Sequence, residues 1–306
     1  MTIASIDIGT NTVLLLIADV DPVTRKIIPL INEYRMPRIG QGTNRSGRIS
    51  QERLKLLYDV LNEYKSIINA CNCDKVILTG TNAFRMASNT PDIIREIKMS
   101  LDYDLKVISG EDEAEYAYFG AISDLDNYSS SMVIDIGGSS TEIIYGEGLN
   151  VVFKKSLQLG SVSATEHYIK NVPHTLNELE NFSTDIKKLF TTLDKTIIPK
   201  KVIAIAGTAT TLACMILGLK NFEENKVDKR SITIQDMRNI IGELSSLTAS
   251  EILVRYGPVM KGREDIIFAG AFILYQFMEY FGIDNIIISI RGVRYGAIVK
   301  YLDSSS

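Results

Sequence analysis

The 306-residue sequence contains three cysteines, two histidines and no tryptophan. Three thiols leave one unpaired, and Cys71 and Cys73 are separated by a single residue. Both facts argue against a framework of disulfide bridges. We expect all three, Cys214 included, to be small buried apolar side chains in a reducing compartment. The polar surroundings of His167 and His174 favour surface positions for both histidines.

Long hydrophobic runs are also missing. Stretches such as Val13–Ala18 and Ile286–Ile288 have the length of strands and fall well short of the ~20 apolar residues of a membrane helix. No basic segment precedes the first apolar residues, and Asp7 interrupts them before a secretory core could form. We therefore expect a soluble, cytoplasmic protein that does not associate with membranes.

An excess of positive charge is absent as well. The 33 basic residues are outnumbered by 37 acidic ones, so the net charge is −4. This balance argues against nucleic acid and anionic lipid as partners, and any polyanion must be bound by local groups. A hydrophobic content of 45% against 23% charged residues is typical of a globular protein. The length suggests two domains.

Two segments of the chain resemble each other. Each consists of a buried strand that ends in aspartate, a turn rich in glycine, serine and threonine, and a second strand. The first copy is Ala4–Thr12 followed by Val13–Val20, and the second is Met132–Thr141 followed by Glu142–Tyr145. Such an internal repeat predicts two similar halves.

The elements after these turns also run in parallel, in the order β-β-β-α-β-α-β-α. In the first half we expect strands and helices at Lys26–Glu33, after Ser50, at Val76–Thr79, after Thr90-Pro91, at Leu105–Ser109 and at about Asp112–Ser123. In the second half we expect them at Val151–Leu157, Asn177–Leu193, Lys201–Ala206, Thr210–Leu217, Ile234–Leu247, Asp265–Phe281, Asn285–Ile290 and from Val293. This order predicts a mixed-sheet α/β fold with a cleft between the halves.

The two glycine-rich turns are candidates for binding phosphate. A turn without bulky side chains lets the backbone approach a ligand and directs N–H groups at it. One such turn is more often an ordinary hairpin, but two at corresponding positions favour a site. The candidate donors are Gly9, Thr10, Asn11, Thr12, Gly137, Gly138, Ser139 and Ser140. Asp7 and Asp135, beside the turns, are placed to hold Mg²⁺.

A third turn and two loops add further anion-binding candidates. Gly207 and Thr208 join a strand to a helix whose N-terminus offers free N–H groups, although a tight connection alone would explain them. Arg38 and Arg85 follow predicted strands, and an arginine can bind two phosphate oxygens at once. Either arginine could equally be a solvated surface residue.

An acidic run opens the helix near residue 112. Acidic residues are common in a first helical turn, so only their position on the helix can distinguish a functional one from the others. Glu113 shares a helix face with the small residues Ala117 and Gly120, which would allow close packing against a cleft, whereas Glu115 aligns with Phe119. Glu113 is therefore the candidate general base.

Six motifs resemble those of the exopolyphosphatase/guanosine pentaphosphate phosphohydrolase (Ppx/GppA) family. They are Asp7–Thr12, Arg38–Gly42, Ser109–Ala114, Asp135–Glu142, Ala206–Thr208 and Arg291–Gly296. The resemblance implies duplicated ribonuclease H-like α/β domains of the actin/Hsp70/sugar kinase superfamily. We expect domains at residues 1–124 and 125–306, with the last helix, about 293–303, a candidate to pack back on the first. Arg291–Gly296 departs from the family's Gly-Leu-Arg-Glu-Gly, which leaves the role of Arg294 open.

The resemblance implies Mg²⁺-dependent hydrolysis of a terminal phosphate in inorganic polyphosphate or in pppGpp. Glu113 matches the family's catalytic glutamate, and Asp135 and Glu142 match its metal-site acids, with Asp7 beside them. The motifs do not distinguish the two substrates, and a homodimer is compatible with them. Two alternatives stay open: an ATP-using kinase or ATPase of the same superfamily, and a phosphate or alarmone sensor without turnover.

Overall fold

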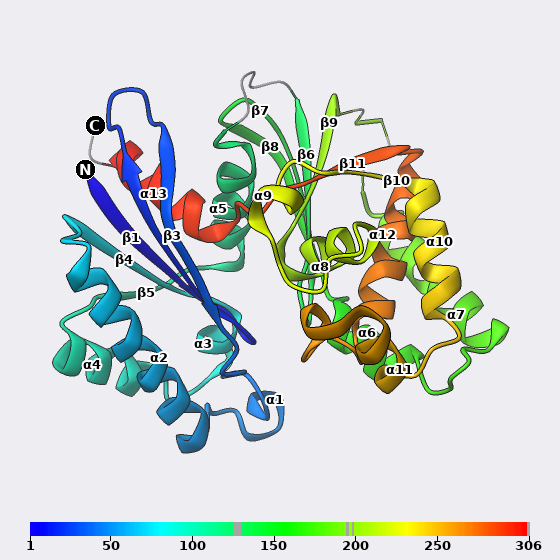
Figure 1. Ribbon diagram of the computed structural model, residues 1–306, viewed down its shortest axis with the longest axis horizontal. Helices are drawn as coiled ribbons and strands as arrows, with labels where there is room; N and C mark the ends of the chain where they lie inside the picture. Colours follow the sequence, from blue (N-terminus) through cyan, green and yellow to red (C-terminus); the bar gives the residue numbers. More distant parts are fainter. Residues whose placement is uncertain (125–129, 194–195, 198, 305–306) are drawn as a thin grey trace. The chain divides into compact units, whose positions relative to one another are not determined.

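The computed structural model describes residues 1–124, 130–193, 196–197 and 199–304, and the chain forms two compact units. Unit 1 comprises Met1–Asp126 and Arg291–Ser306, and unit 2 comprises Asn127–Ile290. The C-terminal helix, red in Figure 1, therefore belongs to the same unit as the N-terminal strands.

Unit 1 alternates strands with helices around one sheet. Its elements are β1 (Thr2–Ile8), β2 (Val13–Val20), β3 (Ile27–Arg35), α1 (Thr43–Ser46), α2 (Gln51–Ala70), β4 (Lys75–Gly80), α3 (Asn82–Met86), α4 (Thr90–Leu101), β5 (Leu105–Val107), α5 (Gly110–Ile122) and α13 (Val293–Ser304). The strand order is β3-β2-β1-β4-β5, with β2 antiparallel to both neighbours and β1, β4 and β5 parallel.

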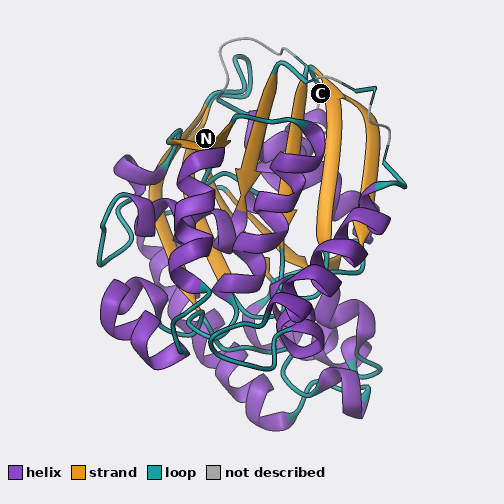
Figure 2. Cartoon of the chain, turned by 90° about the vertical axis from the view of Figure 1, so that its right-hand side faces the viewer, coloured by secondary structure: helices purple, strands orange, loops and turns teal. Residues whose placement is uncertain are grey.

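Unit 2 repeats this order and extends it. Its elements are β6 (Ser131–Ile136), β7 (Thr141–Glu147), β8 (Asn150–Leu157), α6 (Ser161–Tyr168), α7 (Leu176–Phe190), β9 (Lys201–Ile205), α8 (Ala206–Ile216), α9 (Glu224–Val227), β10 (Ser231–Thr233), α10 (Ile234–Leu244), α11 (Ala249–Tyr256), the 3₁₀ helix η1 (Gly257–Met260), α12 (Ile267–Phe281) and β11 (Asn285–Ile288). The sheet runs β10-β11-β9-β6-β7-β8, and helices flank its strands (Figure 2). The repeated order confirms the duplicated ribonuclease H-like fold.

The internal repeat extends to the register of the first hairpin in each unit. Ile8 lies opposite Val13 in unit 1, and Ile136 lies opposite Thr141 in unit 2. Both turns close with the same hydrogen bond, from the first glycine to the carbonyl three residues on, at 2.9 Å in each case. The duplicated sequence segments therefore form the same local structure.

Alternation along β1 decides which of its residues face the core under α2. Ile6 and Ile8 belong to the apolar cluster that contains Leu57 and Leu61 of α2. Because successive side chains of a strand point to opposite faces, Asp7 lies on the other face of the sheet. That face carries α13, which contacts β1, and α5, which packs on α13. The parity of β1 thus places Asp7 beside α5 and α13.

Glycines bring α5 and α13 unusually close together. A Cβ on Gly120 would lie 2.1 Å from the carbonyl oxygen of Gly292, and one on Gly296 would lie 1.8 Å from that of Tyr116. The expectation that the small-residue face of α5 borders a cleft is therefore wrong at Gly120. That glycine is used for helix packing within unit 1.

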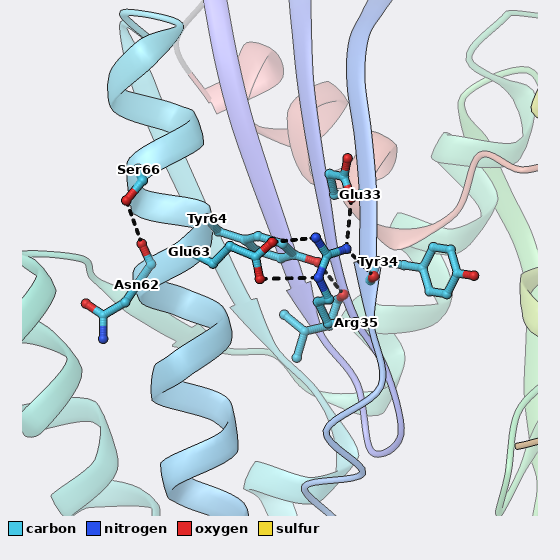
Figure 3. A network of polar contacts seen from close by, with 8 residues as sticks. Glu33, Tyr34, Arg35, Asn62, Glu63, Tyr64 and Ser66 are labelled. Atoms are coloured by element: carbon cyan, nitrogen blue, oxygen red, sulfur yellow. Dashed lines mark hydrogen bonds and ion pairs between the residues drawn. The ribbon is translucent and has the colours of Figure 1, made fainter.

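A polar network connects the edge strand β3 to α2 (Figure 3). Arg35 donates from Nε to Glu63 at 3.2 Å and from Nη1 to Glu33 at 2.8 Å. Its guanidinium also lies 5.9 Å from the ring centre of Tyr64, whose hydroxyl donates to the carbonyl of Val13 at 3.0 Å. Since Val13 begins β2, these contacts support the hairpin of residues 9–12 from the α2 side.

Two predicted helices differ from the structure. The helix expected at Thr210–Leu217 begins at Ala206, because Ala206 adopts a left-handed backbone (φ +64°) that turns the chain directly from β9 into α8. The helix expected at Ile234–Leu247 ends at Leu244, and α11 follows after Thr248. Thr248 and Glu251 form a capping box, a signal that was present in the sequence.

The remaining expectations about rare residues hold in part. Cys214 is buried, whereas Cys71 and Cys73 are only half-buried, and all three are free thiols. His167 is exposed, but His174 is partly covered by Phe268, with ring centres 4.1 Å apart. Within the described ranges, no helix is both long and apolar enough to cross a bilayer.

Candidate functional site

Asp7 is the penultimate residue of β1, and its carboxylate oxygen Oδ1 is shielded from solvent. Burial and, to a smaller extent, the nearby charge of Glu113 raise the pKa of Asp7 to about 7, although Arg294 opposes both effects. Among the residues that the structure describes, no donor bonds its buried Oδ1. The position therefore holds a carboxyl oxygen that would gain a partner from a bound cation or water.

Glu113 lies in the first turn of α5. Ser109 caps this helix by accepting a hydrogen bond from Asp112 N at 3.0 Å, and Glu113 N donates to the carbonyl of Ser109 at 3.0 Å. The side chain of Glu113 is 27% exposed. Burial raises its pKa, while Arg85 opposes that rise by charge and hydrogen bonding. The result is a carboxylate with a raised proton affinity that solvent can still reach.

Arg85, on the short helix α3, pairs with this glutamate. Its Nη1 donates to Glu113 Oε2 at 2.7 Å and to the carbonyl of Ile108 at 3.0 Å. From the sequence, Arg85 and Glu113 are candidates for separate roles, phosphate binding and catalysis. The structure joins them in one ion pair within unit 1.

The turn of residues 9–12 is packed against the loop that carries Arg38. Arg38 N donates to the carbonyl of Asn11 at 3.0 Å, and Gly40 N donates to that of Thr10 at 2.9 Å. A Cβ on Gly40 would lie 2.2 Å from Cγ2 of Thr10, so the close approach requires glycine. Gly9 and Thr12 close the turn through their own backbone bond. Arg38 itself has a left-handed backbone, with φ +50°.

In unit 2 the repeat presents two carboxylates where unit 1 presents one. Asp135 lies directly opposite Glu142 in the β6–β7 pair, whereas Asp7 lies opposite Leu14. Directly opposite side chains share a face of the sheet with Cβ atoms roughly 5 Å apart. Ser156 on β8 donates to Glu142 Oε1 at 2.8 Å. Unit 2 therefore concentrates negative charge at the end of β6.

The second glycine-rich turn is held by the start of α6. Ser161 N donates to the carbonyl of Gly137, and Val162 N to that of Gly138, both at 2.8 Å. A Cβ on Gly160 would lie 2.5 Å from the carbonyl carbon of Gly138, which explains the glycine there. Ser139 is exposed and Ser140 is half-buried at the tip of the turn. These bonds occupy the carbonyls of the two glycines.

The turn between β9 and α8 has a counterpart in unit 1. Thr208 donates from Oγ1 to the carbonyl of Ile136 at 3.0 Å, and Thr81 donates in the same way to Ile8 at 3.3 Å. Both threonines are buried and tie the start of a helix to the end of the first strand. The Gly-Thr pairs at 80–81 and 207–208 mark this repeat, which the sequence analysis did not recognise.

The sequence did not link Arg263 to the turn at Gly207, although the structure brings them together. A Cβ on Gly207 would lie 2.2 to 2.4 Å from the guanidinium of Arg263, so that group lies directly on the glycine at the beginning of α8. No local sequence pattern links residues 56 positions apart. The only sequence signal is that residue 207 is a glycine, which leaves room for another side chain to approach the backbone.

The predicted metal residues divide between the units, with Asp7 in unit 1 and Asp135 and Glu142 in unit 2. Within the part of the chain that is described, no three carboxylate, imidazole or thiol side chains converge as a ready-made metal site. Any metal bound by either unit would therefore complete its coordination with water or substrate oxygens.

The sequence is similar to a known protein family and to several of its members. The Ppx/GppA phosphatase family model matches residues 16–305. Exopolyphosphatase 2 of Mycobacterium tuberculosis is 27% identical over 307 residues, which cover 94% of each chain. The guanosine-5'-triphosphate,3'-diphosphate pyrophosphatase of Aliivibrio fischeri is 29% identical over 168 residues, which are 55% of this chain and 33% of that protein.

The fold agrees with solved members of the same group. The crystal structure of the Aquifex aeolicus member of the Ppx/GppA family has a TM-score of 0.89 and 28% identity, and the match covers 100% of this chain and 99% of that chain. The relatives are named as hydrolases of phosphoanhydride bonds, the enzyme class expected from the motifs. Because the family model matches nearly the whole length of the chain, the chain belongs to the Ppx/GppA phosphatase family.

Proposed function

We propose that this protein hydrolyses the terminal phosphoanhydride bond of inorganic polyphosphate and releases orthophosphate. The observation that carries the proposal is the partly exposed Glu113, whose burial raises its proton affinity and whose carboxylate is held by Arg85. The near full-length similarity to an exopolyphosphatase supports the choice of polyphosphate. A general base beside a fixed cation is the arrangement that in-line attack of water on a phosphoryl group requires.

Glu113 would accept a proton from the attacking water. As the water oxygen bonds to the terminal phosphorus, the bond to the bridging oxygen breaks, and the shortened chain leaves with that oxygen. The proton on Glu113 then returns to solvent or product. Most of the rate enhancement would come from positioning and from neutralising charge on the phosphoryl oxygens.

Neutral and cationic donors would share the binding of the phosphates. In unit 1, the backbone N–H groups and hydroxyls of residues 9–12 would contact phosphate oxygens together with Arg38 and Arg85. In unit 2, the turn of residues 137–140 offers the same kinds of donor. Arg263, which lies on Gly207, is an added candidate in unit 2. A chain with net charge −4 needs such local groups to bind a polyanion.

The carboxylates fit a magnesium ion. Asp135 and Glu142 are directly opposed on adjacent strands, and two like charges at that distance repel unless a cation lies between them. The buried Oδ1 of Asp7, without a donor among the described residues, is a further oxygen of the kind that Mg²⁺ prefers. When bound in unit 2, Mg²⁺ would be held by Asp135 and Glu142 and would neutralise phosphate charge.

Conversion of pppGpp to ppGpp is the second candidate reaction. It cleaves the same kind of terminal bond, and half of the chain resembles a guanosine-5'-triphosphate,3'-diphosphate pyrophosphatase. The groups described here would contact only the terminal phosphates, which the two substrates have in common.

The decisive experiment measures phosphate release from long-chain polyphosphate, tripolyphosphate, pppGpp and ATP side by side, in the presence of Mg²⁺. We expect turnover of polyphosphate, with or without pppGpp, and little turnover of ATP. Release from ATP alone, or transfer of its phosphate to an acceptor, would replace this proposal with an ATPase or kinase. Binding of polyphosphate without any release would indicate a sensor.

A further inference from the structure

Arg85 uses only one of its three nitrogens to hold its neighbours. Nη1 makes both of its hydrogen bonds, to Glu113 Oε2 at 2.7 Å and to the carbonyl of Ile108 at 3.0 Å. Within the described residues, Nε and Nη2 have no acceptor. A guanidinium carries five N–H donors, so three remain, one on Nε and two on Nη2.

The remaining edge is the one that suits a phosphoryl group. Nε and Nη2 present parallel N–H bonds whose spacing matches two oxygens of a phosphate. The side chain of Arg85 is 28% exposed, so solvent and ligands can reach it. Because Nη1 is already bound at two points, the guanidinium plane is oriented before any ligand arrives, which lowers the entropic cost of binding.

We propose that Arg85 is a positioning residue that joins Glu113 to the terminal phosphoryl group of the substrate. Nη1 keeps its bond to Glu113, and Nε and Nη2 each donate to one phosphoryl oxygen. The carboxylate and the phosphorus are then fixed relative to the same rigid plane. A water bound by Glu113 is thereby held at a set distance from the phosphorus. This inference rests on the proposed function.

Two simpler roles for Arg85 make different predictions. If Arg85 only attracted phosphate, its loss would weaken substrate binding whatever residue stood at position 113. If it only stabilised α3 against the start of α5, its loss would lower the thermal stability and reduce kcat and kcat/KM together through loss of folded protein. If Arg85 bridges Glu113 and the phosphoryl group, the effects of substituting Arg85 and Glu113 on kcat/KM must depend on each other.

Arg85→Lys is the most informative variant, because it keeps the charge and removes the planar fork. A lysine ammonium can bond Glu113 or a phosphate oxygen but cannot align both. We expect kcat on polyphosphate to fall about 10²-fold while KM rises less than about 5-fold. Arg95→Lys is the matched control, since Arg95 is an exposed arginine of the same unit that pairs with Asp92. It should leave both constants unchanged.

Chemical rescue provides a second, independent measurement. Guanidinium ion added to Arg85→Ala should restore part of kcat, whereas ammonium ion at equal concentration should not. In the double variant, Arg85→Gln should cost less than about 5-fold in kcat/KM on the Glu113→Gln background, against about 10²-fold or more on the wild-type background. Thermal unfolding of each variant separates these effects from loss of folding.

The outcomes separate this inference from the proposed function. If the wild-type protein releases phosphate and Arg85→Lys retains kcat, or if its loss is confined to KM, the bridge is wrong and the proposed function stands. Equal rescue by ammonium, or equal costs of Arg85→Gln on both backgrounds, would also overturn it. If the wild-type protein releases no phosphate from any of the substrates, the proposed function itself fails.

Discussion

Glu113 and Glu115 are two residues apart on α5 but have different surroundings. Glu113 pairs with Arg85 at 2.7 Å, whereas Glu115 approaches Lys300 of α13 at 3.6 Å. We expect Glu113→Gln to lower kcat about 10²–10⁴-fold with little change in binding, because the amide cannot accept a proton. Glu115→Gln is the control and should change kcat less than about 2-fold. Phosphate release at saturating polyphosphate measures both, and near-normal turnover of Glu113→Gln would remove it from the reaction.

Asp7 predicts an unusual dependence of stability on pH. Its pKa is raised from 3.8 to about 7, mainly by burial, so between these values the folded state binds more protons than the unfolded state. The free energy of unfolding contributed by this group therefore falls as pH rises through that window. The shift corresponds to roughly 1–4 kcal/mol of lost stability at pH about 8.

Replacing the ionisable group tests this prediction. In EDTA, Asp7→Asn should raise the urea midpoint at pH about 8 and have little effect at pH about 3.5, because Asp7 is mostly protonated in both the folded and the unfolded state there. An equal change in the midpoint at both pH values would mean that the substitution acts through packing or lost contacts rather than through titration.

At the scale of elements, the glycines between α5 and α13 predict that a larger side chain there will destabilise the protein. Gly296→Ala would place a Cβ 1.8 Å from the carbonyl oxygen of Tyr116, a backbone atom that cannot move away by rotating a side chain. The two helices must separate, so we expect a loss of at least ~2 kcal/mol in the free energy of unfolding. Chemical denaturation measures it.

Gly242, inside α10, is the matched control. Nothing lies within 4 Å of a Cβ built there. Gly242→Ala should therefore stabilise the protein by ~0.5–1 kcal/mol, since alanine is the better helix former. If Gly296→Ala were as well tolerated as Gly242→Ala, the close contact between α5 and α13 would be wrong.

Elements also differ in how well their limits follow from local signals. The start of α5 is predictable to within two residues because Ser109 is a standard helix cap. The start of α8 is not, because Ala206 takes a backbone conformation that non-glycine residues rarely adopt. An alanine in the sequence does not predict a left-handed backbone, so the surrounding structure must impose this conformation.

For the whole molecule, the prediction concerns metal. EDTA should abolish phosphate release and Mg²⁺ should restore it, because oxygen ligands with room for water suit this ion. Asp135→Asn and Glu142→Gln should each raise the Mg²⁺ concentration needed for half activity, by about 10-fold or more.

A control for this experiment lies on the same strand as Glu142. Glu147, at the end of β7, is exposed and contacts Tyr145 at 3.2 Å. Glu147→Gln should leave the Mg²⁺ dependence unchanged. If Asp135→Asn and Glu142→Gln also left it unchanged, the two carboxylates would not hold the metal.

The sequence by itself determined the duplicated architecture, the first three strands of each half and the two glycine-rich turns after Asp7 and Asp135. These features depend on the alternation of apolar and polar residues, on helical spacing and on the residues that favour turns. Such patterns extend over a few residues and can be recognised in a single sequence. The family motifs then indicated Glu113 as the base and the acids at 135 and 142 as metal ligands, assignments that remain predictions.

Only the tertiary structure decided how these residues are combined. The pairing of Arg85 with Glu113 and the contact of Arg263 with Gly207 each join distant parts of the chain. The burial that raises the pKa of Asp7 is likewise a sum over neighbours from β1, α5 and α13. Such contacts depend on which faces of separate elements meet, and desolvation depends on everything packed around a group, so no local pattern encodes them.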